Sequence, residues 1–484
     1  MEAPEGRGVP RQDSDVVRHH CGLVGISCDR EVNIPELLFY GLFSLQHRGQ
    51  ESAGLAYHRQ GRIKSYRSVG MVANALSHYL SDEHPSRVGM GHVRYSTQGT
   101  NKLENAQPIV VQCSKGEIAL AHNGNISNSR AIAARLQADG SIFQSTSDTE
   151  LLLHLIARSR KPTFREALVE SLGVIEGAYC FLLLHEDTLY AVRDPHGFRP
   201  LVIGRREGQV LIASETCALE MFEAREIREV EPGEMVVVKG TSVASERLPL
   251  PVPPRRAHCI FELIYFARPD SNVYGRSVHM ARKKMGEVLA RADQEEQRGG
   301  PAGKARADIV IAVPDSGNSA ALGYSSASGI PLEQGLTRNH YMGRTFIQPT
   351  TAMRESGVRM KLHPVREAIS GRRIIVVDDS LVRGTTARQI VHLLREAGAT
   401  EVHLRLSSPP LRYPCFYGID IPTREELISN RLDPVGIARE IDADSVRFLS
   451  LEDLRQCVAE ADHFCHACFS GSYPVAVRDA PLKG

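Results

Sequence analysis

The sequence lacks the features that would mark a membrane, secreted or nucleic-acid-binding protein. No apolar run is long enough to cross a membrane, and residues 1–20 are polar and charged, without the hydrophobic segment of a secretory signal. No internal repeat or low-complexity tract is present. The formal net charge is +1, too small to attract a polyanion. These absences predict a cytoplasmic protein that binds neither membranes nor nucleic acid.

What is present is typical of a globular enzyme with two domains. The chain has 484 residues, of which 42% are apolar and 24% are charged. The proline-rich segment LPLPVPP, residues 248–254, is the best domain boundary. Short strand-like segments with a few helices precede it, which predicts an α+β domain of sheets and packed helices. Helices and strands alternate after it, which predicts an α/β domain with a parallel sheet.

A strand, an acid pair, a loop and a helix follow one another in the run RRIIVVDDSLVRGTT, residues 372–386. The apolar residues 374–377 predict a buried strand, and Asp378 and Asp379 stand at its carboxyl end. Gly384 lets the loop backbone approach an anion, and the first N–H groups of the following helix point toward that anion. The carboxylates can accept hydrogen bonds from ribose hydroxyls or hold Mg²⁺. The run therefore indicates a site for a phosphate attached to a ribose.

This run resembles the phosphoribosyl pyrophosphate (PRPP) signature of type I phosphoribosyltransferases. The resemblance implies that the acids bind the ribose hydroxyls and that residues 383–386 surround the 5-phosphate. Mg²⁺ is expected because pyrophosphate carries much negative charge. The implied PRPP contacts are Asp378, Asp379, Ser380, Arg383, Gly384, Thr385, Thr386, Tyr341 and Arg344. The implied metal positions are Ser316, Asp378 and Asp379.

Five further motifs point to Cys21 as a nucleophile. In chain order they are CGLVGIS, QHRGQESAG, GHVRYST, AHNGNISN and STSDTE. They resemble the motifs of N-terminal-nucleophile glutamine amidotransferases, in the order of that family. Hydrolysis of glutamine needs a thiolate that attacks the side-chain amide. An α-amine, with a pKa of about 7.7–8.0, can act as the general base if Cys21 becomes the N-terminus. The resemblance therefore implies cleavage between His20 and Cys21.

The same resemblance implies roles for the residues around the nucleophile. The Asn123 side chain and the Gly124 backbone N–H would hold the oxyanion of the tetrahedral intermediate. Arg94 would bind the α-carboxylate of glutamine, and Asp148 its α-ammonium group. Arg48 either organises this pocket or only packs against it.

The two signatures, in this order, resemble the glutamine PRPP amidotransferase family, also called amidophosphoribosyltransferases, from Cys21 to about Pro474. Further matching motifs are ASET, FELIYFARPDS, VPDSGNSAALGY, RNHYMGRTFIQP and SSPPLRYPCFYGIDIPT. The resemblance implies a propeptide at residues 1–20, an α+β N-terminal-nucleophile hydrolase domain at 21–247, and an α/β phosphoribosyltransferase domain at 258–474 with a C-terminal cluster-binding segment.

The family resemblance also implies the reaction. PRPP, glutamine and water would become 5-phosphoribosylamine, glutamate and pyrophosphate, in the first committed step of de novo purine biosynthesis. Members of the family are usually homotetramers or dimers that purine nucleotides inhibit, so the same is expected here.

Ten cysteines are dispersed through the chain, which indicates reduced thiols, catalysis or metal binding more than disulfides. Four of them match the ligands of a [4Fe–4S] cluster in one branch of the family: Cys259, Cys415, Cys465 and Cys468. Four thiolates suit either such a cluster or Zn²⁺, and the spacing does not separate the two. The resemblance favours the cluster. The remaining cysteines are expected to pack: Cys28, Cys113, Cys180, Cys217 and Cys457.

The poor periodicity of residues 338–366 predicts a long mobile loop, which includes RNHYMGRTFIQPTTAM, residues 338–353. They are rich in arginine and have no sustained apolar period. In the family the equivalent loop closes over PRPP and helps to form a passage for ammonia, so the same is expected of this segment.

Two other functions stay open at this point. One is a different glutamine amidotransferase, such as an enzyme that amidates a sugar or asparagine, and the PRPP signature argues against it. The other is a PRPP-binding regulator without catalysis, and the intact set of glutaminase motifs argues against that.

Overall fold

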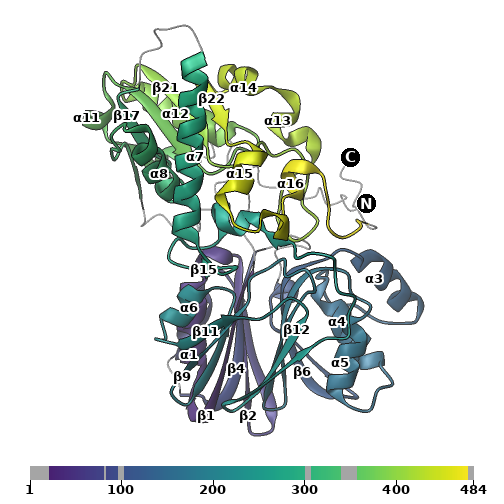
Figure 1. Ribbon diagram of the computed structural model, residues 1–484. Helices are drawn as coiled ribbons and strands as arrows, with labels where there is room; N and C mark the ends of the chain where they lie inside the picture. Colours follow the sequence, from purple (N-terminus) through teal and green to yellow (C-terminus); the bar gives the residue numbers. More distant parts are fainter. Residues whose placement is uncertain (1–20, 81–82, 96–102, 300–306, 340–356, 478–484) are drawn as a thin grey trace, which may run out of the picture.

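The computed structural model describes residues 21–80, 83–95, 103–299, 307–339 and 357–477. Figure 1 shows two halves stacked on each other, the first (purple to teal) below and the second (green to yellow) above. Among the described residues no helix combines the length and the apolar character that crossing a membrane requires. The expected propeptide, residues 1–20, and most of the expected mobile loop, residues 340–356, lie outside the described residues.

The first half is built on two antiparallel sheets. The seven-stranded sheet has the order β11 (Arg225–Glu229), β9 (Val202–Arg206), β10 (Gln209–Ala213), β1 (Gly22–Asn33), β4 (Pro85–Arg94), β2 (Ser52–Arg59) and β3 (Arg62–Val69). The six-stranded sheet has the order β13 (Ser242–Arg247), β12 (Glu234–Lys239), β8 (Thr188–Arg193), β7 (Gly177–His185), β6 (Gly116–Ile126) and β5 (Ile109–Cys113).

Helices cover the outer face of each sheet, which gives four layers (Figure 1). The period-two pattern of the strands explains this, because successive side chains point to opposite faces. In β1, Leu23 packs in the core between the sheets, whereas Val24 and Ile26 pack under the helices of the first layer. Those helices are α1 (Ile34–Ser44), α2 (Val72–Leu76) and α6 (Thr216–Glu220). The fourth layer consists of α3 (Ser129–Ala138), α4 (Thr149–Arg158) and α5 (Phe164–Leu172).

The second half contains a parallel sheet between two groups of helices, as the alternating pattern predicts. Its strand order is β17 (Ile309–Ala312), β20 (Arg373–Asp378), β21 (Glu401–Leu406) and β22 (Ser445–Phe448). Ile375 and Val377 of β20 face one group of helices, and Ile374 and Val376 face the other. The first group is α7 (Val278–Gly299), α8 (Asn318–Ser328) and α15 (Leu451–Cys457); the second includes α12 (Thr385–Glu396) and α14 (Pro434–Glu440).

Short elements connect these layers. The helical ones are η1 (Gln46–Arg48), η2 (Ser77–Leu80), η3 (Leu103–Asn105), the π-helix η4 (Glu262–Phe266), α10 (Gly357–Lys361), α11 (Arg366–Ile369), η5 (Arg424–Glu426), α13 (Ile428–Arg431), η6 (Ala461–His463) and α16 (Ala467–Ser470). The strands are β14 (His258–Cys259), β15 (Asn272–Val273), β16 (Arg276–Ser277), β18 (Leu336–Arg338), β19 (Leu362–Pro364) and β23 (Phe464–Cys465).

One local expectation needs correction. The weak apolar period of residues 338–366 predicts a continuous loop, yet the described part of this segment contains α10 and β19. β19 pairs with β18, so Thr337 lies opposite His363 and Arg338 opposite Leu362. A three-residue strand is too short to show a period, and only its pairing partner identifies it.

Candidate active sites

The chain places the nucleophile and its expected partners at one end of the seven-stranded sheet. Cys21 directly precedes β1, and Arg94 is the last residue of β4. The register of these two strands pairs Gly22 with Val93, so Cys21 and Arg94 lie at the same end of the sheet. The Cys21 thiol donates to the carbonyl oxygen of Tyr95 over 3.8 Å. The charge of Arg94 acts on both Cys21 and Asp148. Three residues predicted from separate motifs are therefore brought into one pocket.

Burial raises the pKa of the Cys21 thiol above its ordinary value, and this effect outweighs the opposing influence of the Tyr95 carbonyl contact and of Arg94. A raised thiol pKa means that the neutral form dominates at neutral pH. The pocket therefore does not activate Cys21 by itself, and the nucleophile needs a separate base.

Asp148 is held as an anion beside this thiol. Its Oδ2 accepts a hydrogen bond from the backbone N–H of Ile126 at 2.8 Å, and its Oδ1 lies 3.6 Å from Nδ1 of His122. Burial alone would raise its pKa, but His122, the Ile126 N–H and Arg94 together lower it below the ordinary value. A buried carboxylate that stays ionised can bind the ammonium group of an amino acid.

Asn123 and Gly124 lie on β6, three and two residues before Ile126. Asn123 is fully buried, and within the described part of the chain neither its Oδ1 nor its Nδ2 has a hydrogen-bond partner. Buried amides are nearly always paired, so this group is typical of a site that a ligand completes. Gly124 has a φ of +152°, and a Cβ there would fall 2.0 Å from the carbonyl oxygen of Ala178 on β7. Only glycine fits this position.

Arg48 both packs and contacts the nucleophile, which answers the question that the sequence leaves open. Its Nε donates to the carbonyl oxygen of Cys21 at 3.2 Å. Its guanidinium group pairs with Glu215 and, through two hydrogen bonds of 2.8 and 3.0 Å, with Glu262 of the second half. All three ionic side chains are fully buried. Glu215 and Glu262 were not predicted, although they belong to the motifs ASET and FELIYFARPDS.

The second site lies at the carboxyl end of the parallel sheet, where ligands of such sheets bind. β20 ends at Asp378, and the Asp379 backbone N–H donates to Asp378 Oδ1 at 2.9 Å. The hydroxyls of Ser316 and Ser380 hydrogen-bond to the Asp379 carboxylate. Gly384, with a φ of +92°, stands at the N-cap of α12. The predicted acids, the serine and the helix N-terminus therefore meet at one place.

Asp378 and Asp379 both have raised pKa values, which a bound cation would lower. Burial raises the pKa of Asp378 well above its ordinary value, and the neighbouring Asp379 raises it further. Burial also raises the pKa of Asp379, against the opposing hydrogen bonds from Ser316 and Ser380. A cation would reverse both shifts, because it stabilises the ionised forms. These oxygen ligands suit Mg²⁺, which commonly uses one or two carboxylates together with waters and substrate phosphates.

The structure describes four of the other expected PRPP contacts besides Gly384, and two lie outside the described residues. Ser380 lies in the loop, and Thr385 and Thr386 open α12. The Arg383 side chain pairs with Glu426 of η5, with Nε 3.0 Å from Oε2, so its guanidinium group is already engaged. Tyr341 and Arg344 lie outside the described residues.

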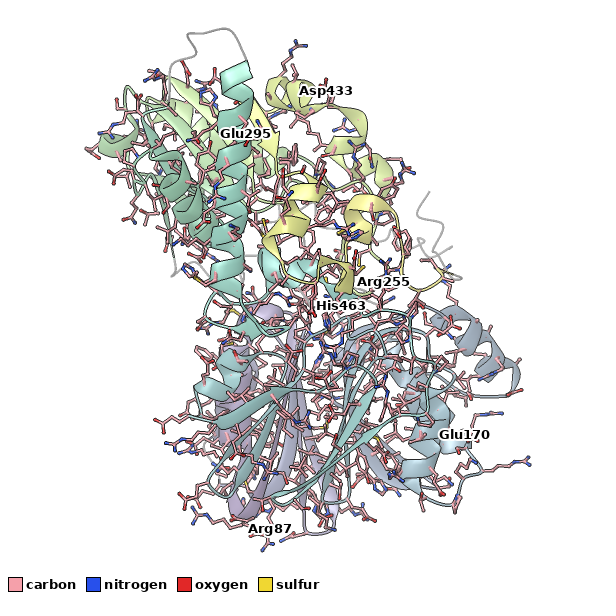
Figure 2. All side chains as sticks on the ribbon, in the orientation of Figure 1. Arg87, Glu170, Arg255, Glu295, Asp433 and His463 are labelled. Carbon is pink, nitrogen blue, oxygen red and sulfur yellow. The ribbon has the colours of Figure 1, made fainter. Side chains whose placement is uncertain are left out.

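The four cysteines of the expected cluster gather where the C-terminal segment returns to the linker. β14 and β23 pair in parallel and put Cys259 beside Cys465. Figure 2 places Arg255 and His463, which precede these strands, near the boundary of the two halves. Burial raises the pKa of Cys259 to about 11, with a contribution from Cys415. The pKa of Cys468 is raised by burial and by the three other thiols.

These four thiols form no disulfide, and the pKa of Cys468 responds to each of the other three. Within the described ranges no group of three or more His, Cys, Asp or Glu side chains has the arrangement that holds a metal ion. A zinc site needs four ligands around one ion. A [4Fe–4S] cluster takes one thiolate on each of four irons, which keeps the ligands apart. Four thiols are a donor set that suits either group, so the preference for a cluster over zinc rests on the family resemblance.

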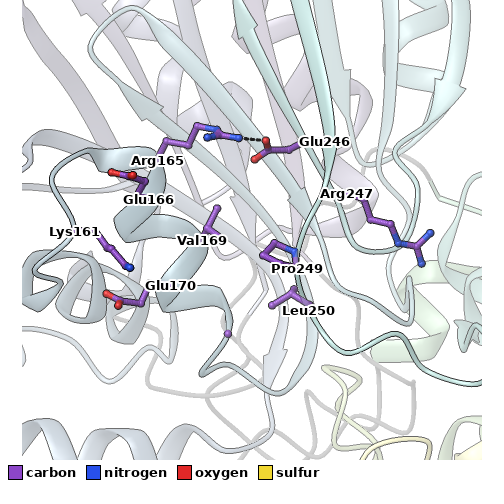
Figure 3. Close-up of a pocket in the computed structure, with 10 residues that line it drawn as sticks. Lys161, Arg165, Glu166, Val169, Glu170, Glu246, Arg247, Pro249 and Leu250 are labelled. Atoms are coloured by element: carbon purple, nitrogen blue, oxygen red, sulfur yellow. Dashed lines mark hydrogen bonds and ion pairs between the residues drawn. The ribbon is translucent and has the colours of Figure 1, made fainter.

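A surface hollow of about 540 Å³ lies apart from these centres (Figure 3). It is formed by α5, the end of β13 and the start of the linker. Arg165 and Glu246 form an ion pair across it, and Lys161 and Glu170 also line it. None of the predicted site residues belongs to it.

Comparisons with known proteins show what the whole chain is similar to. The family model described as glutamine amidotransferase domain matches residues 92–221. Amidophosphoribosyltransferase 1 of Arabidopsis thaliana, a chloroplastic protein, is 47% identical over 98% of this chain and 81% of its own length. The amidophosphoribosyltransferase of Bacillus subtilis is 44% identical over 95% of each chain. The solved structure of the B. subtilis glutamine PRPP amidotransferase complexed with ADP and GMP superimposes with a TM-score of 0.86, at 44% identity, over 96% of this chain and 99% of that one.

Proposed function

The chain belongs to the amidophosphoribosyltransferase family, and on this premise we propose how its residues divide the work of the reaction. The enzyme is a glutamine-dependent PRPP amidotransferase that acts in the first step of purine biosynthesis. It converts PRPP, glutamine and water to 5-phosphoribosylamine, glutamate and pyrophosphate. The two rival functions are thereby set aside, and the roles of individual residues are the proposal.

In the glutaminase centre, Cys21 attacks the side-chain amide of glutamine. Arg94 binds the α-carboxylate of the substrate, and Asp148 its α-ammonium group. The lowered pKa of Asp148 supports this role, because the carboxylate is ionised wherever glutamine is a zwitterion. The raised pKa of Cys21 supports the need for a base, and cleavage after residue 20 would supply one as the free α-amine. Residues 1–20 are accordingly proposed as a propeptide.

The observation that carries this assignment is the buried Asn123 amide, whose oxygen and nitrogen both lack partners among the described residues. An oxyanion hole must present donors before the charge develops, so its donors are unpaired in the free enzyme. Asn123 Nδ2 and the Gly124 N–H are proposed as those donors.

In the phosphoribosyltransferase centre, Asp378 and Asp379 bind the ribose hydroxyls of PRPP, and the loop before α12 binds the 5-phosphate. The N-terminus of α12 supports the phosphate role through its dipole and the direction of its first N–H groups. Mg²⁺ held by Ser316, Asp378 and Asp379 would neutralise the charge of the departing pyrophosphate. Tyr341 and Arg344 are proposed as further PRPP contacts.

A [4Fe–4S] cluster is proposed at the gathered thiols of Cys259, Cys415, Cys465 and Cys468, with a structural role. The segments that carry them come from the linker, from the loop after β21 and from the C-terminus. A cluster there would tie these three segments together.

The remaining features of the family are proposed by analogy. ADP and GMP occupy the B. subtilis structure, which supports inhibition of this enzyme by purine nucleotides. A homotetramer or dimer is proposed. The domains are proposed at residues 21–247 and 258–474, since the two sheets of the first half end with β13 at Arg247 and β14 begins at His258. A cytoplasmic location stays a prediction, because the Arabidopsis relative is chloroplastic.

The experiment that tests the division of labour replaces Cys21 with Ala and measures pyrophosphate release from PRPP with glutamine or with ammonia. We expect the glutamine-dependent rate to vanish and the ammonia-dependent rate to stay within about twofold. Cys113→Ala is the control, because Cys113 is a free thiol at the end of the edge strand β5 and has no assigned role. Equal loss of both activities in Cys21→Ala would overturn the proposal of two separate centres.

A further inference from the structure

The strand that carries the proposed oxyanion hole is in contact with the second half of the chain. Asn125, next to Gly124, donates from its Nδ2 to the carbonyl oxygen of Phe416 at 2.8 Å. A Cβ built on Gly418 would lie 3.1 Å from both the carbonyl carbon and the oxygen of Gly124. A Cβ built on Gly124 would meet Ala178 of β7, as described above. The backbone of Gly124 is thus in close contact with β7 and, through its carbonyl group and Cα, with Gly418.

Residues 415–418 are themselves firmly held. The Tyr417 carbonyl oxygen accepts a hydrogen bond of 2.7 Å from Arg199, and the Tyr417 ring stacks on Phe198 with 4.4 Å between the ring centroids. The Tyr417 hydroxyl donates to the carbonyl oxygen of Val475 at 2.7 Å. The segment begins at Cys415, one of the four gathered thiols. It is therefore a rigid support and not a passing surface loop.

A series of hydrogen bonds and ion pairs also links this segment to Cys21. Arg199 pairs with Glu262, with Nη1 3.3 Å from Oε1, and Glu262 pairs with Arg48. Arg48 in turn donates to the Cys21 carbonyl oxygen. Cys21 is therefore linked to the second half through Arg48 and Glu262, and Gly124 is linked to it through residues 416–418.

We propose that residues 416–418 are a positioning element of the glutaminase site, which holds the backbone of Gly124 in the conformation that an oxyanion hole requires. The physical reason is that Gly124 has no side chain and adopts a backbone conformation open mainly to glycine, so its own residue does little to restrict the φ rotation that orients its N–H relative to its carbonyl group. Rotation would turn its N–H away from the developing charge, and a donor contributes only if it is already in place. The glutaminase half is incomplete without this segment.

This inference rests on the proposed roles of Asn123 and Gly124, and its test is Gly418→Ala. The added methyl group presses on Gly124, and the φ of +101° adds backbone strain. Gly371→Ala is the matched control, because Gly371 also has a positive φ, +74°, but has nothing within 4 Å of its Cβ position. Both variants place alanine at a positive φ, but only Gly418→Ala adds a contact with Gly124.

For Gly418→Ala we expect kcat for glutamine hydrolysis to fall about tenfold, less than the roughly 10²–10³-fold loss typical when an oxyanion donor is deleted. The KM for glutamine should not change, because Arg94 and Asp148 bind the other end of the substrate. Ammonia-dependent synthesis and the alkylation of Cys21 by iodoacetamide should match Gly371→Ala. An equal fall in ammonia-dependent synthesis, or hydrolysis equal to that of the control, overturns the inference.

Asn125→Ala removes the hydrogen bond to Phe416 between the same two segments and adds no backbone strain. It is the variant to measure if Gly418→Ala does not fold. We expect kcat for hydrolysis to fall several-fold at constant KM. In the double variant the effects of Asn125→Ala and Gly418→Ala should be less than multiplicative, because both act on one contact. A fully multiplicative result overturns the inference. Asn123→Ala separates this inference from the proposed function: if it leaves hydrolysis unchanged, the oxyanion assignment itself is wrong.

Discussion

The buried charges between the two halves permit a quantitative prediction for Arg48→Met. This change removes a cation that pairs with Glu215 and Glu262, all three with side chains no more than 1% exposed. Removing one partner of a buried ion pair destabilises a protein by about 3–5 kcal/mol, because the other charge remains buried. Here each acid keeps a second partner. Glu215 retains His47 at 2.7 Å, and Glu262 retains Arg199 at 3.3 Å.

The lower end of that range is therefore expected, about 3 kcal/mol. At roughly 2–4 °C per kcal/mol for a domain of about 200 residues, the thermal midpoint of the first half should fall by about 6–12 °C. Glutamine hydrolysis should fall more than ammonia-dependent synthesis, because the Cys21 carbonyl loses its donor. Differential scanning calorimetry and the two activity assays measure both effects.

Arg158→Met is the matched control for this prediction. Arg158 pairs with Asp139 at 2.9 Å, but both side chains are more than 40% exposed. Exposed pairs contribute about 0.2–1 kcal/mol, so the midpoint should move by no more than about 4 °C. If Arg48→Met shifts the midpoint no further than Arg158→Met does, the reasoning about buried charge is refuted.

Three further predictions address the other assignments. Asp378→Asn with Asp379→Asn should cripple PRPP use with either nitrogen source, because both reactions share these acids; unchanged PRPP saturation kinetics would contradict this. The protein purified without oxygen should be brown and hold about four irons per chain, and Cys468→Ser should lose them; stoichiometric zinc without iron would show the cluster assignment to be wrong. In a chain that still carries residues 1–20, alkylation of Cys21 should have its pH midpoint above the ordinary thiol value of about 8.5, because burial raises the pKa; a midpoint below it would exclude that effect.

The elements that carry the proposed PRPP site were predictable because their signals are local. The run of apolar residues before Asp378 predicts β20, which ends at that residue. The recurrence of Ile390, Leu393 and Leu394 predicts α12, and these side chains are buried. A strand or helix repeats at a period of two or 3.6 residues, so a short stretch of sequence contains the whole pattern. The motifs around Cys21 likewise carried the residues proposed for the glutaminase site, because each motif is contiguous.

The contacts between the halves could not be predicted in this way. Glu262 stands in a recognisable motif, but nothing near it in the sequence says that it pairs with Arg48, 214 residues away. Arg383 stands in the loop that is expected to bind the phosphate, and nothing near it in the sequence says that its guanidinium group pairs with Glu426 on a separate short helix. Such pairs depend on the docking of whole layers, and the charge of a side chain does not indicate which distant partner will meet it.

The contact of Gly124 and Asn125 with residues 416–418 shows the same limit most clearly. The sequence by itself determined that Gly124 belongs to a glutaminase motif and that Cys415 belongs to a group of thiols. Only the tertiary structure decided that the chain just after Cys415 lies against Gly124, with Asn125 and Phe416 joined across 291 positions of sequence. The physical reason is that periodicity and motifs record the local environment of the backbone, whereas a contact between domains is settled by the packing of all the elements that hold the two segments in place.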